Sequence, residues 1–308
     1  MQSSTFTLPA ADGAALWTYR WLPDSAPRAV VQIAHGLAEH AGRYARLAGA
    51  LTAARYAVYA NDHRGHGRSA ANAEALGFFA ERDGWQRVVD DLWLLNRRIA
   101  ADHPGLPIIL LGHSMGSFLA QHFIIEHGDA LAGAVLSASS GKPAPLAAIG
   151  RLIARIERLR LGPRGRSALL TAFSFGAFNK AFAPARTKFD WLSRDAAEVD
   201  KYIADPLCGF PATAQLWIDM LDALGEIARP ARQARIAKSL PIYVISGTRD
   251  PVGAGTKGPE QLLAAYRAAG LARVGHRFYP DARHELFNEI NRDEVTRDLI
   301  AWLDGVIA

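Results

Sequence analysis

The sequence predicts an α/β fold: a mostly parallel central sheet with helices on both faces and a helical cap inserted between two of its strands. Three observations lead to this prediction. Short apolar runs alternate with segments of helical periodicity, one long stretch in the second half lacks any strand pattern, and 308 residues can bury a large single core.

The alternation begins near the N-terminus, where residues 6–8 and 16–21 predict a hairpin because the second run is rich in aromatic strand formers. Residues 30–34 and 107–111 are nearly all apolar, as strands covered on both faces are. We expect the other strands at 56–60, 134–136, 241–246 and 277–279, and helices at 43–54, 85–102, 115–127, 258–269 and 292–306. Strands separated by helices of this length imply right-handed crossovers.

Residues 140–238 break the alternation, because they are helical in pattern and contain no convincing buried strand. We therefore expect residues 1–139 and 239–308 to form the core, and residues 140–238 to form a helical cap that returns to it. In the cap, residues 146–160 place apolar side chains on one helical face (Ile149, Leu152, Ile153, Ile156, Leu159) and arginines on the other (Arg151, Arg155, Arg158). We expect the apolar stripe to pack against the core. The alternative is that this basic amphipathic helix lies on an anionic membrane surface.

The composition argues against several classes of protein. Half of the residues are hydrophobic, and the formal net charge is +5 without a basic run that alternates with aromatics, so we expect no nucleic-acid partner. The longest apolar runs are strand-sized, and the first residues lack the pattern of a secretion signal. The single cysteine, Cys208, fits a reducing compartment. We expect a cytoplasmic protein, either free or peripheral to a membrane.

The clearest chemical motif is Gly-x-Ser-x-Gly at residues 112–116, between a predicted buried strand and a predicted helix. This spacing places Ser114 on a strained strand-to-helix turn, and the glycines let the two backbones approach each other. A serine hydroxyl is a weak nucleophile at neutral pH unless a base takes its proton. Ser114 is therefore the candidate nucleophile.

Two later loops supply a base and an acid. Asp250 follows the next-to-last predicted strand and His284 follows the last one, so both lie with Ser114 at the carboxyl edge of the sheet. We expect His284 to accept the serine proton and Asp250 to orient His284. Asp281 is a rival acid, although it lies in the histidine's own loop, and His276 is a rival base that we place before the last strand.

An acyl-transfer site also needs two N–H groups that bind the oxyanion. We assign them to the amide of Met115, directly after the nucleophile, and to the amide of Leu37, after the strand at 30–34. Around these groups we place five further residues: His35, Gly36, Glu39, Arg43 and His113. Glu39, Arg43 and residues 62–69 either hold the oxyanion loop by hydrogen bonds and ion pairing or form a plain surface cluster.

Four histidines invite a test for a metal site. His63 and His66 form a His-x-x-His pair, with His35 and His40 in a neighbouring segment, but no pair of ligands on a helix is evident. We expect no catalytic metal and no cofactor.

The chain resembles the monoacylglycerol lipase and lysophospholipase branch of the α/β-hydrolases. The resemblance rests on residues 35–44, 62–69, 112–117, 205–208 and 279–285, which span nearly the whole chain. It implies that Ser114, Asp250 and His284 form a catalytic triad, that Leu37 and Met115 line the oxyanion hole, and that the cap shapes an apolar tunnel for an acyl chain. Residues 142–185 carry no family motif.

The expected activity is hydrolysis of a carboxylic ester through an acyl-enzyme, with a monoacylglycerol or a lysophospholipid as the substrate. Three alternatives remain. The same fold and triad can act on a non-lipid ester, an amide or a peptide; a hydrolase fold can serve as a non-catalytic sensor or scaffold; and a metal-dependent hydrolase is the third.

Overall fold

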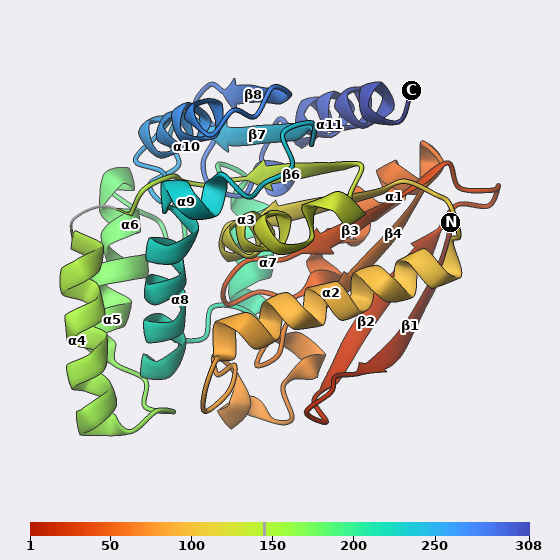
Figure 1. The fold of residues 1–308 in the computed structure, drawn as a ribbon. Helices are drawn as coiled ribbons and strands as arrows, with labels where there is room; N and C mark the ends of the chain where they lie inside the picture. Colours follow the sequence, from red (N-terminus) through yellow and green to blue (C-terminus); the bar gives the residue numbers. More distant parts are fainter. Residues whose placement is uncertain (144–145) are drawn as a thin grey trace.

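A computed structural model describes residues 1–143 and 146–308. Its strands form one sheet in the order β1-β2-β4-β3-β5-β6-β7-β8 (Figure 1). β2 runs antiparallel to β1 and β4, and all other neighbours are parallel. This mostly parallel sheet confirms the predicted fold class. The strands are Gln2–Pro9 (β1), Ala15–Leu22 (β2), Ala29–Ala34 (β3), Tyr56–Asn61 (β4), Ile108–His113 (β5), Gly133–Ser137 (β6), Ile242–Gly247 (β7) and Val274–Tyr279 (β8).

Helices cover both faces of the sheet (Figure 1). Along β3, Val30 and Ala34 belong to one hydrophobic core, while Val31 and Ile33 belong to the other. This alternation follows from the two-residue period of a strand and explains why the strand is apolar throughout. The first core is built with α2 (Gly84–Asp102), α3 (Met115–His127) and α10 (Lys257–Ala268), and the second with α1 (Ala45–Ala53) and α11 (Arg292–Ile307).

Two element boundaries differ from the prediction. The helix expected at 43–54 is a 3₁₀ turn, Ala41–Tyr44, followed by α1. The last strand begins at Val274, so His276 lies inside β8 and not before it. β8 is an edge strand and is half-exposed, so it lacks the apolar run by which the buried strands are recognised.

Between β6 and β7 the described residues form helices and no strand. These helices are α4 (Leu146–Leu161), α5 (Ala168–Thr171), α6 (Ala177–Asn179), α7 (Ala196–Ala204), α8 (Ala214–Ile227) and α9 (Pro230–Gln233). Residues 144–145, inside the expected cap, lie outside the described residues. We keep the name cap for residues 140–238.

The prediction that α4 packs its apolar stripe against the core was wrong. Four of the five apolar side chains are between 53% and 84% exposed: Ile149, Leu152, Ile156 and Leu159. The arginine face is turned toward α8 instead, where Arg151 and Arg155 pair with Asp222 and Arg158 donates to Gln215 at 2.5 Å. Ala154 is fully buried and Ile153 packs against the first core, so this side of α4 faces inward while the other four apolar side chains stay in solvent. In the described ranges no helix is long and apolar enough to cross a bilayer.

Candidate active site

Ser114 lies on the turn between β5 and α3 with a φ of +52°, a conformation that non-glycine residues rarely adopt. The neighbouring glycines make the turn possible. A β-carbon at Gly112 would overlap the backbone of Gly116, and one at Gly116 would overlap the carbonyl of Ala34. The strained turn raises the serine above the carboxyl edge of the sheet, as the motif predicts.

His284 and Asp250 meet in a buried hydrogen bond of 2.9 Å between Nδ1 of the ring and Oδ1 of the carboxylate. The imidazole ring lies between the rings of His113 and Trp191, each with its centroid 4.9 Å away. Because Nδ1 donates to Asp250, the other ring nitrogen is available to accept a proton. His284 and Ser114 line the same pocket.

The rival residues lie elsewhere. Asp281 is exposed, and its backbone N–H donates to the Thr248 hydroxyl at 2.8 Å. His276 is exposed on the edge strand β8. The structure thus brings His284 to Asp250 and gives neither rival a place in this pair.

The charge of Asp250 determines how His284 binds protons. Burial by itself works to lower the pKa of the ring, but the adjacent carboxylate and its hydrogen bond raise the pKa of His284 above its usual 6.5. The neighbouring His113 shows the opposite behaviour, because burial and the proximity of His284 lower its pKa to about 4. His113 is therefore neutral at physiological pH and packs against His284 without competing for its proton.

The loop after β3 passes directly beside Ser114. A β-carbon at Gly36 would lie 3.3 Å from Cβ of Ser114 and 2.8 Å from a carboxylate oxygen of Glu39. Only glycine allows this close approach. The loop therefore brings Gly36 against the nucleophile, and the next residue, Leu37, lines the pocket together with Met115.

His35 determines the direction of the Leu37 amide. Its Nδ1 lies 2.8 Å from the carbonyl oxygen of Gly36, and its Nε2 accepts the backbone N–H of His63 at 2.9 Å. Together these contacts require the tautomer with the proton on Nδ1. The Gly36 carbonyl and the Leu37 N–H belong to one trans peptide group and point in opposite directions, so holding the carbonyl fixes the N–H. Burial, with His63 nearby, keeps the pKa of His35 well below 6.5 and the ring neutral.

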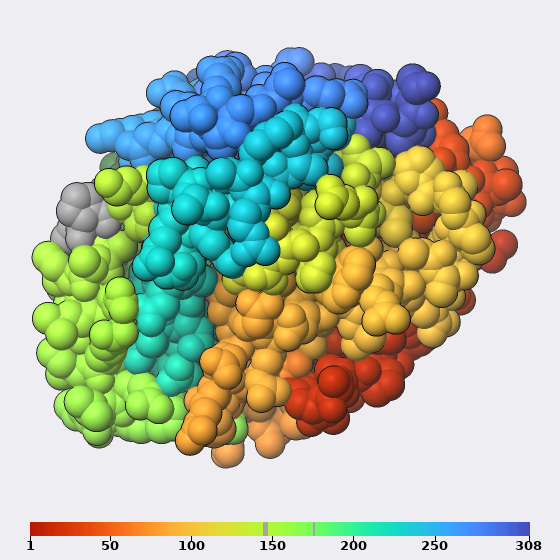
Figure 2. All heavy atoms as spheres, in the orientation of Figure 1, coloured from red at the N-terminus to blue at the C-terminus, as the bar shows by residue number. Residues whose placement is uncertain are grey.

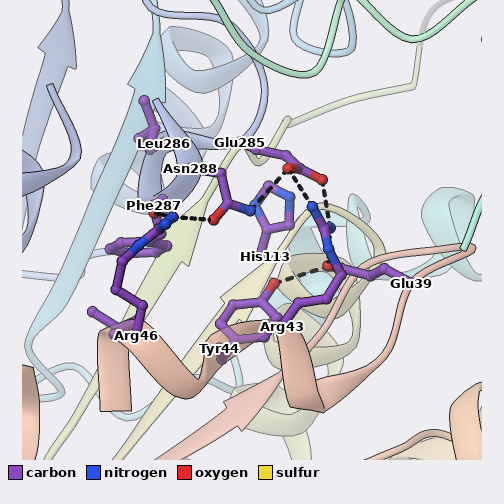
Figure 3. Close-up of a pocket in the computed structure, with 10 residues that line it drawn as sticks. Glu39, Arg43, Tyr44, Arg46, His113, Glu285, Leu286, Phe287 and Asn288 are labelled. Atoms are coloured by element: carbon purple, nitrogen blue, oxygen red, sulfur yellow. Dashed lines mark hydrogen bonds and ion pairs between the residues drawn. The ribbon is translucent and has the colours of Figure 1, made fainter. Parts of the chain in front are cut away.

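A buried ion cluster supports the same loop (Figure 3). The Arg43 guanidinium contacts a carboxylate oxygen of Glu39 at 2.6 Å and both oxygens of Glu285 at 2.7 Å. The other oxygen of Glu39 accepts the Gly36 N–H at 2.6 Å and the Tyr44 hydroxyl at 2.9 Å. Burial works to raise the pKa of Glu285, but Arg43 holds it well below its usual range. Arg43 thus joins the loop after β3 to the residue that follows His284.

Sequence reasoning did not select Glu285, Trp191 or Tyr202 as site residues. Glu285 and Arg43 are 242 positions apart, and no local pattern reports such a pairing. Trp191 and Tyr202 belong to the cap and lie in none of the segments that carry the family resemblance. For Glu285 the available signals were its place in the segment 279–285 and its adjacency to His284.

His40, Asp205 and Cys208 form a cluster of potential metal ligands. Ligand atoms of His40, Asp205 and Cys208 lie within 4.8 Å of one another. However, His40 Nε2 already pairs with Asp205 at 2.9 Å, and burial raises the pKa of the Cys208 thiol above its usual value. A thiol that retains its proton is a poor metal ligand, because metals bind the thiolate.

The pocket at Ser114 has a volume of about 180 Å³ and is predominantly apolar. Its walls include side chains from α3 and from the cap: Phe118, Phe173, Phe178, Trp191, Trp217 and Met220. Of the described lining residues none is arginine or lysine, and the lining carboxylates, Glu39 and Glu285, both pair with Arg43. The cavity is thus suited to a neutral substrate with an apolar segment.

Comparison with known proteins identifies the family of the chain. The family model described as serine aminopeptidase, S33, matches residues 25–291. Monoacylglycerol lipase from Mycolicibacterium smegmatis is 33% identical over 92% of this chain and 90% of its own length, and human monoglyceride lipase is 29% identical over 91% and 87%. A thermostable carboxyl esterase from Bacillus coagulans, solved in complex with glycerol, superposes with a TM-score of 0.92 at 26% identity over the whole of both chains. The chain therefore belongs to the serine aminopeptidase S33 family of α/β-hydrolases.

Proposed function

We propose that the chain is a serine esterase that hydrolyses monoacylglycerols through an acyl-enzyme. The observation that carries the proposal is the buried His284–Asp250 pair, which lines the same apolar pocket as Ser114. The identity to proteins named monoacylglycerol and monoglyceride lipase supports this substrate class.

In the proposed mechanism, His284 takes the proton of Ser114 while Asp250 holds the ring and stabilises the imidazolium that forms. The alkoxide attacks the ester carbonyl, and the amides of Leu37 and Met115 bind the oxyanion. The alcohol leaves with the proton from His284. A water activated by the same ring then releases the fatty acid and regenerates Ser114.

Two features of the pocket favour a neutral ester over its rivals. An aminopeptidase substrate carries an α-ammonium group, which calls for an unpaired carboxylate, yet Glu39 and Glu285 are both paired with Arg43. A lysophospholipid carries a phosphate, which calls for a cation, and the described pocket lining includes no arginine or lysine. A glyceryl head group needs neither.

The test is a substrate panel combined with Ser114→Ala. The panel contains a monoacylglycerol, the matching lysophosphatidylcholine, a p-nitrophenyl ester and an aminoacyl anilide. We expect the monoacylglycerol to give the highest kcat/KM, and Ser114→Ala to lose about 10⁵–10⁶ in kcat, by analogy with other triads. Anilide turnover above ester turnover, or a serine variant that retains ester hydrolysis, would overturn the proposal.

We also propose that the exposed face of α4 places the protein on a lipid surface. The four exposed apolar side chains belong to α4, whose light-green segment forms the left edge of the molecule beside α8 (Figure 2). Two further apolar side chains that follow α4 in the sequence, Leu169 and Phe173, are 45% and 65% exposed. Phe173 also lines the pocket, so the exposed apolar residues reach the pocket at this point. Since Arg151 and Arg155 are paired with Asp222, apolar burial contributes more to this binding than attraction to anionic lipid.

Vesicle co-sedimentation tests this arrangement. The double variant Leu152→Ser/Ile156→Ser should bind neutral phosphatidylcholine vesicles at least tenfold more weakly, because each burial of a large aliphatic side chain contributes about 1.5–3 kcal/mol. Ile290→Ser is the matched control, since Ile290 is 60% exposed away from α4. Equal loss in the control, or unchanged binding in the double variant, would contradict the proposal.

A further inference from the structure

Ala38 occupies a conformation that its sequence position does not explain. Its φ is +57°, in the left-handed region that side chains with a β-carbon rarely adopt, and the residue is fully buried. It directly follows Leu37, whose amide we assign to the oxyanion hole. Something outside the loop must therefore hold this backbone in place.

The cap supplies the contacts that hold it. The carbonyl oxygen of Ala38 accepts the hydroxyl of Tyr202, on α7, at 2.8 Å and the backbone N–H of Gly209 at 2.9 Å. Tyr202 is buried, and the Arg43 guanidinium lies over its ring, 4.8 Å from the centroid. The phenol is thereby fixed on both its face and its hydroxyl.

The oxyanion loop is thus held from two sides. The core holds the Gly36 carbonyl through His35, and the cap holds the Ala38 carbonyl through Tyr202 and Gly209. Leu37 lies between the two. We propose that Tyr202 is a positioning residue that keeps the Leu37 amide aimed into the oxyanion hole, so that the seating of the cap controls transition-state stabilisation. This inference rests on the proposed esterase function.

Tyr202 also lines the pocket, so a direct role in binding the alcohol part of the substrate is the competing explanation. A phenol has one hydrogen to donate, and here it is donated to Ala38. The two roles predict different substrate dependence. A positioning residue affects every ester equally because every ester forms the same oxyanion, whereas a head-group contact affects only the substrate that has the head group.

The experiment compares Tyr202→Phe with wild type on a monoacylglycerol, a methyl ester and a p-nitrophenyl ester of one acyl chain. Loss of an entire oxyanion donor costs about 10²–10³ in turnover, and a donor that is present but less well held should cost about tenfold. We expect kcat to fall by that factor on all three esters with KM unchanged. Tyr266→Phe is the matched control, because the buried Tyr266 hydroxyl has no hydrogen-bond partner in the described part of the chain.

Amide hydrogen exchange gives a second readout that needs no turnover. Residues 36–40 should exchange faster in Tyr202→Phe than in wild type or Tyr266→Phe, while the global unfolding temperature changes little. A kcat loss confined to the monoacylglycerol, or unchanged kcat with unchanged exchange, would overturn the inference. Failure of the proposed function would instead be seen in the wild type, as absence of ester hydrolysis, and the exchange measurement would still decide whether Tyr202 holds the loop.

Discussion

Replacing Arg43 by methionine would remove the cation with which two buried carboxylates pair in the described part of the chain. Glu39 and Glu285 are 3% and 6% exposed, and Arg43 contacts both within 2.7 Å (Figure 3). Methionine preserves most of the volume of the arginine stem but leaves both carboxylates without a counter-charge. The variant therefore isolates the contribution of the charge.

Removing one partner of a buried ion pair costs about 3–5 kcal/mol, because the remaining charge stays desolvated. Unfolding entropy of about 2.1 cal/mol/K per residue gives about 0.65 kcal/mol/K for 308 residues, so this cost lowers Tm by about 5–8 °C. Arg43→Lys keeps the charge but not the bidentate geometry, and should lose less.

The pH dependence provides the sharper test. In wild type the pKa of Glu285 is held below its usual 4.5, so its stabilisation is fully present above that pH and is lost as the pH falls further. Without Arg43, burial raises the pKa of Glu285, which can relieve its charge by binding a proton as the pH falls toward 5. The gap in stability between wild type and variant should therefore be largest near pH 8 and shrink by more than half near pH 5.

Thermal unfolding from pH 8 to pH 5 measures this gap. Arg229→Met is the control, because Arg229 and its partner Glu226 are 65% and 45% exposed and such pairs contribute about 0–1 kcal/mol. A gap that does not change with pH would mean that lost packing, and not unpaired charge, destabilises the variant. A shift of Tm no larger than that of the control would refute the argument altogether.

Two further predictions concern the site. The proposed mechanism needs neutral His284, and Asp250 raises the pKa of that ring above 6.5, so kcat/KM of the wild type should fall tenfold per pH unit once the pH is below this pKa. In Asp250→Asn the fall should begin at lower pH, and the plateau should be about 10⁴ lower. A fall that begins at the same pH in the variant would assign the titration to another group. Gly116→Ala should unfold the turn or abolish activity, because its β-carbon would overlap the Ala34 carbonyl. The control is Gly225→Ala, at a helical position with open space, which should stabilise the protein by about 0.5–1 kcal/mol in denaturant titrations. Equal effects of the two substitutions would show that the glycine spacing is not a packing requirement.

The elements predicted best were those whose structure is determined by a short segment of sequence. The apolar runs of β3 and β5 were recognisable because both faces of these strands are covered, and the nucleophile turn was recognisable because its glycines permit a close backbone approach. The loops that carry Asp250 and His284 could be placed together because parallel strands end at one edge of the sheet. Each inference needed only a few consecutive residues.

The features that sequence reasoning missed depend on partners far away in the chain. Helical periodicity revealed the two faces of α4 but not which side faces inward, because that side is defined by long-range contacts: Ile153 and Ala154 pack against the core, and the arginines contact Asp222 and Gln215 on α8. The partner of Arg43 at Glu285 and the contact of Tyr202 with Ala38 are likewise long-range. Such pairings leave no periodic signal.

Arg43 occupies the point where three segments of the proposed machinery meet. Its guanidinium binds Glu39 of the oxyanion loop and Glu285 beside His284, and it packs on the ring of Tyr202 from the cap. A shift of the cap would therefore act on the oxyanion donors and on the histidine loop through one side chain, and not through two independent paths. In the proposed mechanism the oxyanion hole must be accurate to a fraction of an ångström. The cap meets this requirement even though the apolar face of α4 lies in solvent, because its segment at Tyr202 and Gly209 is hydrogen-bonded to the Ala38 carbonyl of the core.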